Sequence, residues 1–287
     1  MKVVRTVADV ALIISRTKIS GRKVAFVPTM GAIHEGHLSL VSLAKQNADL
    51  VIASIFVNPL QFTSTADFDL YPRSEEVDAR ALNKAGVDVL FLPTVDEIYP
   101  DGKFTITQRA GKVGDSYEGA SRPGHFDGML TVVSRLFDIV QPDVAVFGEK
   151  DAQQLFLIRQ MVSVQNPLGN RDPIQILGAP TIRDTKGLAL SSRNKRLAKN
   201  QLQLALALPH CLAEAQLAAS RGGGASSAYF SASSVFSATG EAKLDYLALV
   251  NPETFEPIEE GFTGQALMIV AATVGDVRLI DNRLITF

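Results

Sequence analysis

The sequence contains no tryptophan and only one cysteine, Cys211, in 287 residues. One thiol cannot form an internal disulfide, which excludes a disulfide-stabilised secreted domain and is typical of a reducing compartment. Cys211 lies in an apolar stretch, so we expect it to pack in a core and not to react. These features predict a cytoplasmic protein.

Long apolar runs and an excess of one charge are also missing. The longest apolar runs, residues 50–57 and 266–274, are too short to span a bilayer, which needs about 20 residues. Charged residues spread through the first twenty positions exclude the apolar block of a signal peptide. The formal net charge of −2 gives no global field that attracts nucleic acid or an anionic membrane. We therefore expect small-molecule ligands. Binding of any phosphate group would depend on a local cluster of cationic side chains.

Hydrophobic residues make up 46% of the chain and charged residues 20%, as in ordinary globular proteins. Up to about residue 178, short apolar runs alternate with helical stretches. We predict strands at 24–27 (ended by Pro28), 50–57, 87–92, 144–147 and 174–177, and helices at 38–47, 75–85, 129–140 and 152–162. This alternation predicts an α/β fold, with a doubly wound, Rossmann-like parallel sheet that binds ligands at the carboxyl ends of its strands.

After residue 178 the pattern changes, and we predict a second, smaller α+β domain. The predicted domains are therefore residues 1–178 and 179–287. A long helix at 199–220 precedes three glycines, 222–224, which with the following serines indicate a flexible connection inside this domain. The predicted strands are 244–250, 266–274 and 277–280.

The segment Pro28–His37 follows the first strand directly and opens the first helix. Its glycines allow a ligand to approach the backbone, and a helix start offers unpaired amides and a positive dipole end to phosphate. His34 and His37 are three residues apart and share a helix face, so both can donate to a triphosphate and offset charge at the α-phosphorus. Zinc binding by a helix would require i, i+4 spacing and a third ligand, and two surface caps are the other alternative.

A second segment, Leu190–Asn194, carries two hydroxyls and a guanidinium at Ser191, Ser192 and Arg193. These groups can form an anion clamp of fixed charge. Taken alone, the segment is better explained as an exposed turn. Together with the histidine segment it resembles the two-part ATP signature of the nucleotidylyltransferase and class I aminoacyl-tRNA synthetase superfamily. Adenylation of a carboxylate is the chemistry that such a pair serves.

A third segment, Phe147–Gln154, follows the fourth predicted strand and so lies at the same sheet edge as the histidines. Lys150 can neutralise phosphate, Asp151 can accept from a ribose hydroxyl, and Gln154 can hold polar groups of a substrate. A solvated loop is the alternative for this segment. The loop at 58–62, after the second strand, adds another amide-bearing segment at that edge.

Over nearly its whole length the chain resembles the pantothenate synthetase family. The resemblance rests on residues 28–37, 54–59, 71–73, 118–126, 147–154, 190–194 and 279–282. It implies an ATP-dependent ligase that joins pantoate to β-alanine. ATP and pantoate would give pantoyl adenylate and pyrophosphate, and β-alanine would then release AMP and pantothenate. The family is usually a homodimer and needs Mg²⁺, mainly as the ATP complex.

The resemblance also implies roles for individual residues. The implied catalytic residues are His37, His34, Lys150 and Arg193. The implied ATP-binding residues are Met30, Gly31, His34, His37, Gly148, Glu149, Lys150, Asp151, Ile182, Leu190, Ser191, Ser192 and Arg193. Pro28, Gln61 and Gln154 would bind pantoate or β-alanine. The metal ligands stay unknown, with Asp78 as the one candidate. Asp127 departs from the family, whose members usually carry a basic residue there, so no contact is carried over to it.

Two other functions fit part of this pattern. A simple nucleotidylyltransferase would leave the nucleotide on its product, so AMP among the products would discriminate against it. A nucleotide-sensing protein would bind ATP without catalysis, but it has no need of groups aimed at the α-phosphorus.

Overall fold

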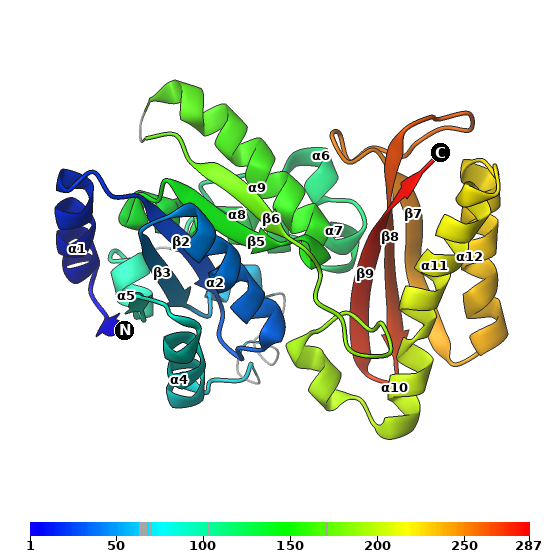
Figure 1. Ribbon diagram of the computed structural model, residues 1–287, viewed down its shortest axis with the longest axis horizontal. Coiled ribbons are helices and arrows are strands. Elements are labelled where there is room, and N and C mark those ends of the chain that lie inside the picture. Colours follow the sequence, from blue (N-terminus) through cyan, green and yellow to red (C-terminus); the bar gives the residue numbers. More distant parts are fainter. Residues whose placement is uncertain (63–67, 69–70, 103, 170–171) are drawn as a thin grey trace. The chain divides into compact units, whose positions relative to one another are not determined.

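The computed structural model describes residues 1–62, 68, 71–102, 104–169 and 172–287. The chain divides into two compact units. Unit 1 comprises Met1–Glu149 and Leu157–Pro180, and unit 2 comprises Lys150–Phe156 and Thr181–Phe287. Figure 1 labels the elements of both units.

Within the described residues, unit 1 contains a six-stranded sheet in which every neighbouring pair is parallel, in the order β1-β4-β3-β2-β5-β6. The strands are β1 (Lys2–Val4), β2 (Val24–Thr29), β3 (Leu50–Ile55), β4 (Val89–Phe91), β5 (Val144–Gly148) and β6 (Gln175–Ala179). The predicted parallel sheet is confirmed. The sequence pattern missed β1, because this edge strand has only 3 residues and only one of them is buried.

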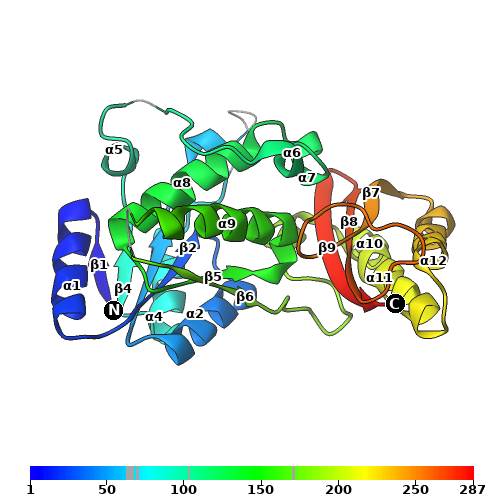
Figure 2. The ribbon, with the colours of Figure 1, turned by 90° about the horizontal axis from the view of Figure 1, so that it is seen from above.

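Helices cover both faces of the sheet, which confirms the doubly wound architecture. The main helices are α1 (Val7–Ile19), α2 (Glu35–Asn47), α4 (Glu75–Ala85), α8 (His125–Val140) and α9 (Ala152–Gln165), with short helices α5 (Val95–Ile98), α6 (Gly111–Gly114) and α7 (Glu118–Ser121). Figure 2 shows α8 and α9 on one side of the sheet and α2 and α4 on the other. Phe137 of α8 packs edge-on against Phe26 of β2 and Phe147 of β5, with ring centroids 6.5 and 6.3 Å apart.

Pro28 lies inside β2, so the prediction that it ends the strand was wrong. Pro28 pairs with Ser54 of β3, whereas the register of β2 with β5 includes only Ala25 and Phe26. The missing N–H of Pro28 therefore removes no bond from the β5 ladder. The predicted end of α4 is confirmed, because Gly86 caps it in the left-handed conformation with φ 89°.

The strand order places the switch point of the sheet between β2 and β5. From β2 the chain builds outward to β3 and β4, and it then returns to β5 on the other side of β2. In such sheets, ligands bind in the crevice at the carboxyl ends of the strands where the order reverses. Here those ends are Thr29 and Gly148. The histidine segment and the start of the Phe147–Gln154 segment leave the sheet at these two points.

The described part of unit 2 contains a three-stranded antiparallel sheet, β7 (Ala242–Val250), β8 (Gln265–Val274) and β9 (Val277–Thr286). Helices α11 (Ala207–Ser220) and α12 (Ala225–Thr239) lie together on one side of it (Figure 1). Small buried residues let them approach each other and the sheet, among them Ala215, Ala228 and Ala232. The predicted smaller α+β part is confirmed, although β9 continues to Thr286, beyond the predicted end at residue 280.

The predicted helix 199–220 is two helices, α10 (Lys199–Ala205) and α11, divided at Leu206. A continuous helix would need the amide of Pro209 to bond the carbonyl of Ala205, and proline has no such amide. In α11 Pro209 falls in the first turn, where no donor is required.

The serines after the triple glycine belong to α12 and do not form a flexible connection. Ser226 anchors the start of the helix, because its amide and its hydroxyl both donate to Glu260. The first helical turn therefore has a fixed carboxylate at its positive end.

No helix in the described ranges is both long and apolar enough to cross a membrane.

Candidate active site

The loop between β2 and α2 is held by a buried carboxylate on α4. The amides of Ala32 and Ile33 donate to Oδ2 and Oδ1 of Asp78, each at 2.9 Å. Gly31 adopts φ 86°, and a Cβ there would lie 3.0 Å from Asp78 Oδ2. The close approach of Asp78 therefore requires glycine at this position.

This geometry gives Asp78 a positioning role that the sequence did not indicate. Its side chain is 2% exposed and both of its oxygens accept backbone hydrogen bonds. Among the described residues no group of three His, Cys, Asp or Glu could hold a metal ion. The contacts of Asp78 thus favour loop positioning, and its candidacy as a metal ligand gains no support from neighbouring carboxylates.

His34 and His37 form one structural unit at the start of α2. The amide of Gly36 donates to Nδ1 of His34 at 3.1 Å, and the amide of His34 donates to Nδ1 of His37 at 3.4 Å. The two rings are 4.2 Å apart between centroids and tilted by 41°. Because each Nδ1 accepts from a backbone N–H, the proton of each neutral ring is on Nε2. In this tautomer the ring hydrogen-bond donors of the pair are the two Nε2–H groups.

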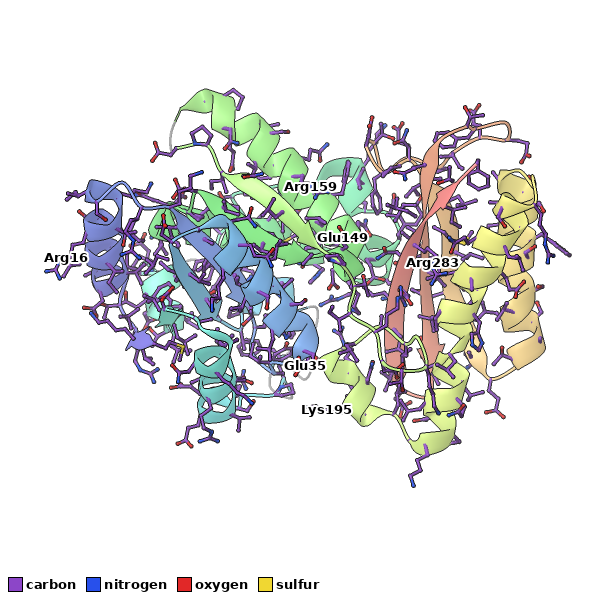
Figure 3. All side chains as sticks on the ribbon, in the orientation of Figure 1. Arg16, Glu35, Glu149, Arg159, Lys195 and Arg283 are labelled. Carbon is purple, nitrogen blue, oxygen red and sulfur yellow. The ribbon has the colours of Figure 1, made fainter. Side chains whose placement is uncertain are left out.

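The expectation that the first turn of α2 offers unpaired amides to phosphate was wrong for its central amides. The amide of Gly36 bonds His34, and the amide of His37 bonds the carbonyl of His34 at 2.8 Å. Glu35, labelled in Figure 3, is the first residue of α2. Neither the amide of Gly36 nor that of His37 is therefore unpaired.

Gln61 ends the short 3-10 helix η1 (Pro59–Gln61) that follows β3. It is buried, and its Nε2 lies 2.8 Å from Sδ of Met30. The structure thus brings the predicted substrate residue Gln61 against the predicted nucleotide residue Met30. Pro28 lies two residues before Met30, at intermediate burial. A cavity of ≈ 270 Å³ adjoins Met30 and Gly31 and is also lined by Asp78.

The backbone of Gln61 is held by α8, a contact that the sequence did not predict. Nδ1 of His125 lies 2.7 Å from the carbonyl oxygen of Gln61, and Nη1 of Arg122 lies 3.1 Å from Nε2 of His125. Arginine can only donate, so Nε2 of His125 accepts and its Nδ1–H donates to Gln61. His125, which is buried, therefore holds the end of η1.

Asp127 is fixed by contacts with the segment that precedes α8. Its Oδ2 accepts from Nη1 of Arg109 at 2.6 Å, and its Oδ1 accepts from the amide of Ala110 at 2.8 Å. It also lies in the first turn of α8, where a carboxylate is stabilised by the helix dipole. The negative charge thus ties the preceding segment to α8.

The segment after β5 divides between the units. Gly148 ends β5 and Glu149, labelled in Figure 3, is exposed at the start of the 3-10 helix η2 (Glu149–Asp151). In unit 2, Nζ of Lys150 lies 3.9 Å from Oδ1 of Asp151, and its side chain is 17% exposed. Gln154, in the first turn of α9, is partly buried. Lys150 and Asp151 thus form a compact polar pair beside α9.

The serine–arginine segment begins the 3-10 helix η4 (Ser192–Arg196). Ser191 is its N-cap, because its hydroxyl accepts from the amide of Arg193 at 3.2 Å. The amide of Leu190 donates to the carbonyl of Ile182 at 2.9 Å. These bonds give the segment a defined backbone, so its side chains extend from an ordered turn.

An ion pair with a buried carboxylate ties the turn that precedes Leu190 to β9. Arg183, beside Ile182, donates through Nη1 and Nη2 to Asp281 at 2.6 and 2.7 Å, and through Nη1 to the carbonyl of Gly187 at 2.9 Å. The hydrogen bonds to Asp281 raise the pKa of Arg183, so its charge is stable. Next to Asp281, Asn282 donates to the carbonyl of Lys150 at 2.9 Å.

The motif near the end of the chain thus bonds the backbone of Lys150 directly, and through Arg183 it holds the turn that precedes Leu190. The sequence pattern singled out residues 279–282 but not their function. Two features of the sequence could have indicated this function. Asp281 is a single acidic residue in a mainly apolar strand, and Arg183 lies shortly before the serine–arginine segment.

The predicted site residues fall into two groups. Unit 1 contains Pro28, Met30, Gly31, His34, His37, Gln61, Asp78, Gly148 and Glu149. Unit 2 contains Lys150, Asp151, Gln154, Ile182, Leu190, Ser191, Ser192 and Arg193. Each group combines hydrogen-bond donors with a defined backbone, and the cations are concentrated in the second group.

Comparison with known proteins gives one family. The family model for pantoate-beta-alanine ligase matches residues 2–284. Pantothenate synthetase of Mycolicibacterium smegmatis is 48% identical over 276 residues, which cover 96% of this chain and 84% of the relative. That of Acidothermus cellulolyticus is 47% identical over 283 residues, with coverages of 98% and 90%.

Solved structures agree with the family model. The crystal structure of pantothenate synthetase from Thermus thermophilus has a TM-score of 0.91 at 44% identity and covers 99% of both chains. Pantoate-beta-alanine ligase from Francisella tularensis, in complex with beta-gamma ATP and beta-alanine, has a TM-score of 0.79 at 36% identity and covers 99% of this chain and 97% of that one. This chain therefore belongs to the pantoate-beta-alanine ligase family.

Proposed function

We propose that the chain is an AMP-forming ligase that joins pantoate to β-alanine through a pantoyl-adenylate intermediate. The family model and the full-length relatives support the overall reaction, and the Francisella complex with ATP and β-alanine supports the two co-substrates. The observation that carries the mechanism is the paired imidazoles of His34 and His37, whose Nδ1 atoms are both engaged by backbone amides.

In the first step, a carboxylate oxygen of pantoate attacks the α-phosphorus of ATP. The bond from the α-phosphorus to the bridging oxygen breaks, and pyrophosphate leaves with the bonding electrons. Negative charge grows on the phosphate oxygens during this step. We assign the stabilisation of this charge to the Nε2–H groups of His37 and His34, together with Lys150 and Arg193. Preorganised donors of this kind typically account for a large share of catalysis.

In the second step, the neutral amine of β-alanine attacks the acyl carbon of the adenylate. The carbon–oxygen bond to AMP breaks, AMP leaves, and the nitrogen loses a proton to give the amide. Pro28, Gln61 and Gln154 are assigned to bind pantoate, with Gln61 also near β-alanine. We assign binding of the nucleotide to the remaining predicted residues, among which Gly148 and Asp151 would contact the ribose.

An acyl adenylate hydrolyses if water reaches it, so the reaction favours a covered site. We assign ATP and pantoate binding to the Rossmann-like domain of residues 1–178, and the role of a lid to the smaller domain of residues 179–287. The cytoplasm as location and a homodimer as assembly are part of the same proposal.

Mg²⁺ is proposed to enter with ATP. Magnesium usually keeps several waters and binds through substrate phosphates with one or two carboxylates, so an all-protein cage is not needed. When bound, Mg²⁺ would supply charge neutralisation at the phosphates that Lys150 and Arg193 also contact.

The ligase is tested by measuring AMP with ATP, Mg²⁺ and pantoate, with and without β-alanine. We expect AMP and pantothenate to appear together, and only when the amine is present. A nucleotidylyltransferase would instead keep the nucleotide on its product. ATP binding without any turnover of pantoate would contradict the substrate assignment.

Replacing Gln154 with alanine is expected to raise the KM for pantoate about tenfold while the KM for ATP stays near the wild-type value, since it removes a hydrogen bond to a charged substrate. Steady-state kinetics with each substrate varied in turn measures both constants. Gln160→Ala is the matched control, because Gln160 is an exposed glutamine on the same helix. An unchanged pantoate KM in Gln154→Ala would remove Gln154 from the pocket.

A further inference from the structure

A chain of buried hydrogen bonds in unit 1 leads to Gln61 and has no part in the mechanism above. Tyr99, the C-cap residue of α5, donates its hydroxyl to Oδ1 of Asn58 at 2.9 Å. Asn58 in turn donates through Nδ2 to Oε1 of Gln61 at 3.3 Å. All three side chains are buried, and Asn58 is 1% exposed. Tyr99 is 41 residues from Asn58 in the sequence, so only the fold brings them together.

The amide of Asn58 has one allowed orientation. Its Oδ1 accepts from the hydroxyl of Tyr99 and from the amide of Leu60 at 3.3 Å. Its Nδ2 donates to Gln61 and to the carbonyl of Gly128 at 3.1 Å. A flipped amide would put its NH₂ group against the Leu60 N–H and its oxygen against the Gly128 carbonyl. Both lone pairs and both protons of the amide are therefore used, as a buried side-chain amide requires.

Tyr99 is held as a donor in this chain. Desolvation by burial raises the pKa of Tyr99 to about 12, and the nearby charge of Arg135 lowers it by a smaller amount. The hydroxyl thus keeps its proton throughout the physiological range. Its bond to Asn58 is also the shortest of the four that the Asn58 amide makes.

The direction of hydrogen-bond donation, from Tyr99 to Asn58, continues from Asn58 to Gln61. Because Asn58 donates to Oε1 of Gln61, the nitrogen end of the Gln61 amide must point the other way, toward Met30. A thioether sulfur is only a weak acceptor. An oxygen of an acid substrate would therefore be a better partner for this nitrogen than Sδ of Met30.

The surrounding backbone is packed too tightly to let this chain rearrange. A Cβ on Gly128 would lie 2.1 Å from the carbonyl oxygen of Leu60 and 3.0 Å from the amide nitrogen of Gln61. Only glycine permits α8 to approach η1 this closely. With His125 bonded to the Gln61 carbonyl, the backbone of Gln61 is fixed from the same helix.

We propose that Tyr99 is a positioning residue for the acid substrate: through Asn58 it fixes the Gln61 amide with its nitrogen toward the site, so that Gln61 acts as a hydrogen-bond donor. Tyr99 touches no reacting atom, and its effect reaches the substrate only through Asn58 and Gln61. The inference rests on the proposed role of Gln61 in binding pantoate.

The first test is Tyr99→Phe, which removes the hydroxyl and keeps the ring. Loss of one hydrogen bond in the chain is expected to raise the KM for pantoate about three- to tenfold, with kcat and the KM for ATP within about twofold of wild type. Thr17→Val is the matched control, because it removes another buried hydroxyl of unit 1, whose bond to the Ile13 carbonyl is 2.9 Å. The control is expected to lower Tm without changing the KM for pantoate.

The second test asks whether Tyr99 acts through Gln61. In a Gln61→Met background, where no amide is left to orient, adding Tyr99→Phe is expected to change the pantoate KM by less than about twofold. Gln61→Glu keeps an acceptor for Asn58 but replaces the donor with an anion. It is expected to raise the pantoate KM further than Gln61→Met does, because pantoate is itself an anion.

Two results would overturn the proposal. One is that Tyr99→Phe has the same effect in the wild-type and Gln61→Met backgrounds, which would make its role purely structural. The other is that Gln61→Glu binds pantoate better than Gln61→Met, which would make Gln61 an acceptor. Both are judged against wild-type turnover in the same assay. A wild type that does not turn over pantoate contradicts the proposed ligase, whereas an active wild type with either result contradicts only the role of Tyr99.

Discussion

Replacing His37 with alanine is expected to slow formation of the adenylate by about 10²-fold or more, the usual loss when one preorganised donor to a developing charge is removed. Nδ1 of His37 accepts from the His34 amide, so its proton, on Nε2, is the one assigned to a phosphate. The rate is measured as pyrophosphate released in a single turnover with saturating ATP and pantoate, before β-alanine is added.

His37 also contributes to the N-terminal cap of α2, so the catalytic loss must be separated from a folding loss. His37→Gln is the matched variant, because a glutamine at the third helical position can accept from the N-cap amide in a capping box. We expect His37→Gln to recover the decrease in Tm seen in the alanine variant. We do not expect it to recover the full wild-type rate of adenylate formation. His210→Ala, an exposed histidine on α11, should retain wild-type activity. Full activity of His37→Ala at saturating ATP would show that the assigned role is wrong.

Replacing Asp281 with alanine is expected to destabilise the protein by about 3–5 kcal/mol, the usual effect of removing one partner of a buried ion pair. The carboxylate is almost fully buried and accepts two bonds from Arg183. Its loss leaves the Arg183 guanidinium partly buried without its main acceptor. Chemical unfolding in urea, followed by the fluorescence of the tyrosines, measures the change.

The matched control is a second Arg–Asp pair, between β9 and β7, whose carboxylate is more exposed. Arg278 bonds Asp245 at 2.6 Å with side-chain exposures of 26% and 37%, and removing Asp245 is expected to cost about 0.2–1 kcal/mol. Because Arg183 also holds the turn next to Leu190, Asp281→Ala should in addition raise the KM for ATP. Equal unfolding midpoints for the Asp281 and Asp245 variants would contradict the assigned anchor.

The fold of the sheet was predictable because its buried strands are continuous apolar runs, such as residues 50–55 of β3. Elements without such a signal were missed. β1 has 3 residues and is exposed at two of them, and α12 is rich in serine, which is a turn signal by composition alone. The break at Leu206 depends on one residue, Pro209, and could have been predicted from the missing amide of proline.

The candidate site was predictable only as a set of loops. Local spacing identified His34 and His37, because both lie within one helical turn. The partners that position the loops come from distant parts of the chain: Asp78 is 46 residues from Ala32, and Asp281 is 98 residues from Arg183. No local pattern encodes such contacts, since they depend on how strands and helices pack. The occupied amides of α2 differ from these contacts, because their acceptor is local: Gly36 and His37 both donate to His34 within one helical turn.

The central claim, that the carboxylate of pantoate is activated as an adenylate, is tested most directly by following its oxygen atoms. Pantoate labelled with oxygen-18 in the carboxylate is converted with ATP and β-alanine, and the AMP is analysed by mass spectrometry. If the carboxylate attacks the α-phosphorus, one labelled oxygen stays with the phosphorus when the amide forms, so AMP gains a single label and pyrophosphate gains none. Unlabelled AMP with label in pyrophosphate or phosphate would contradict the adenylate and require attack at another phosphorus.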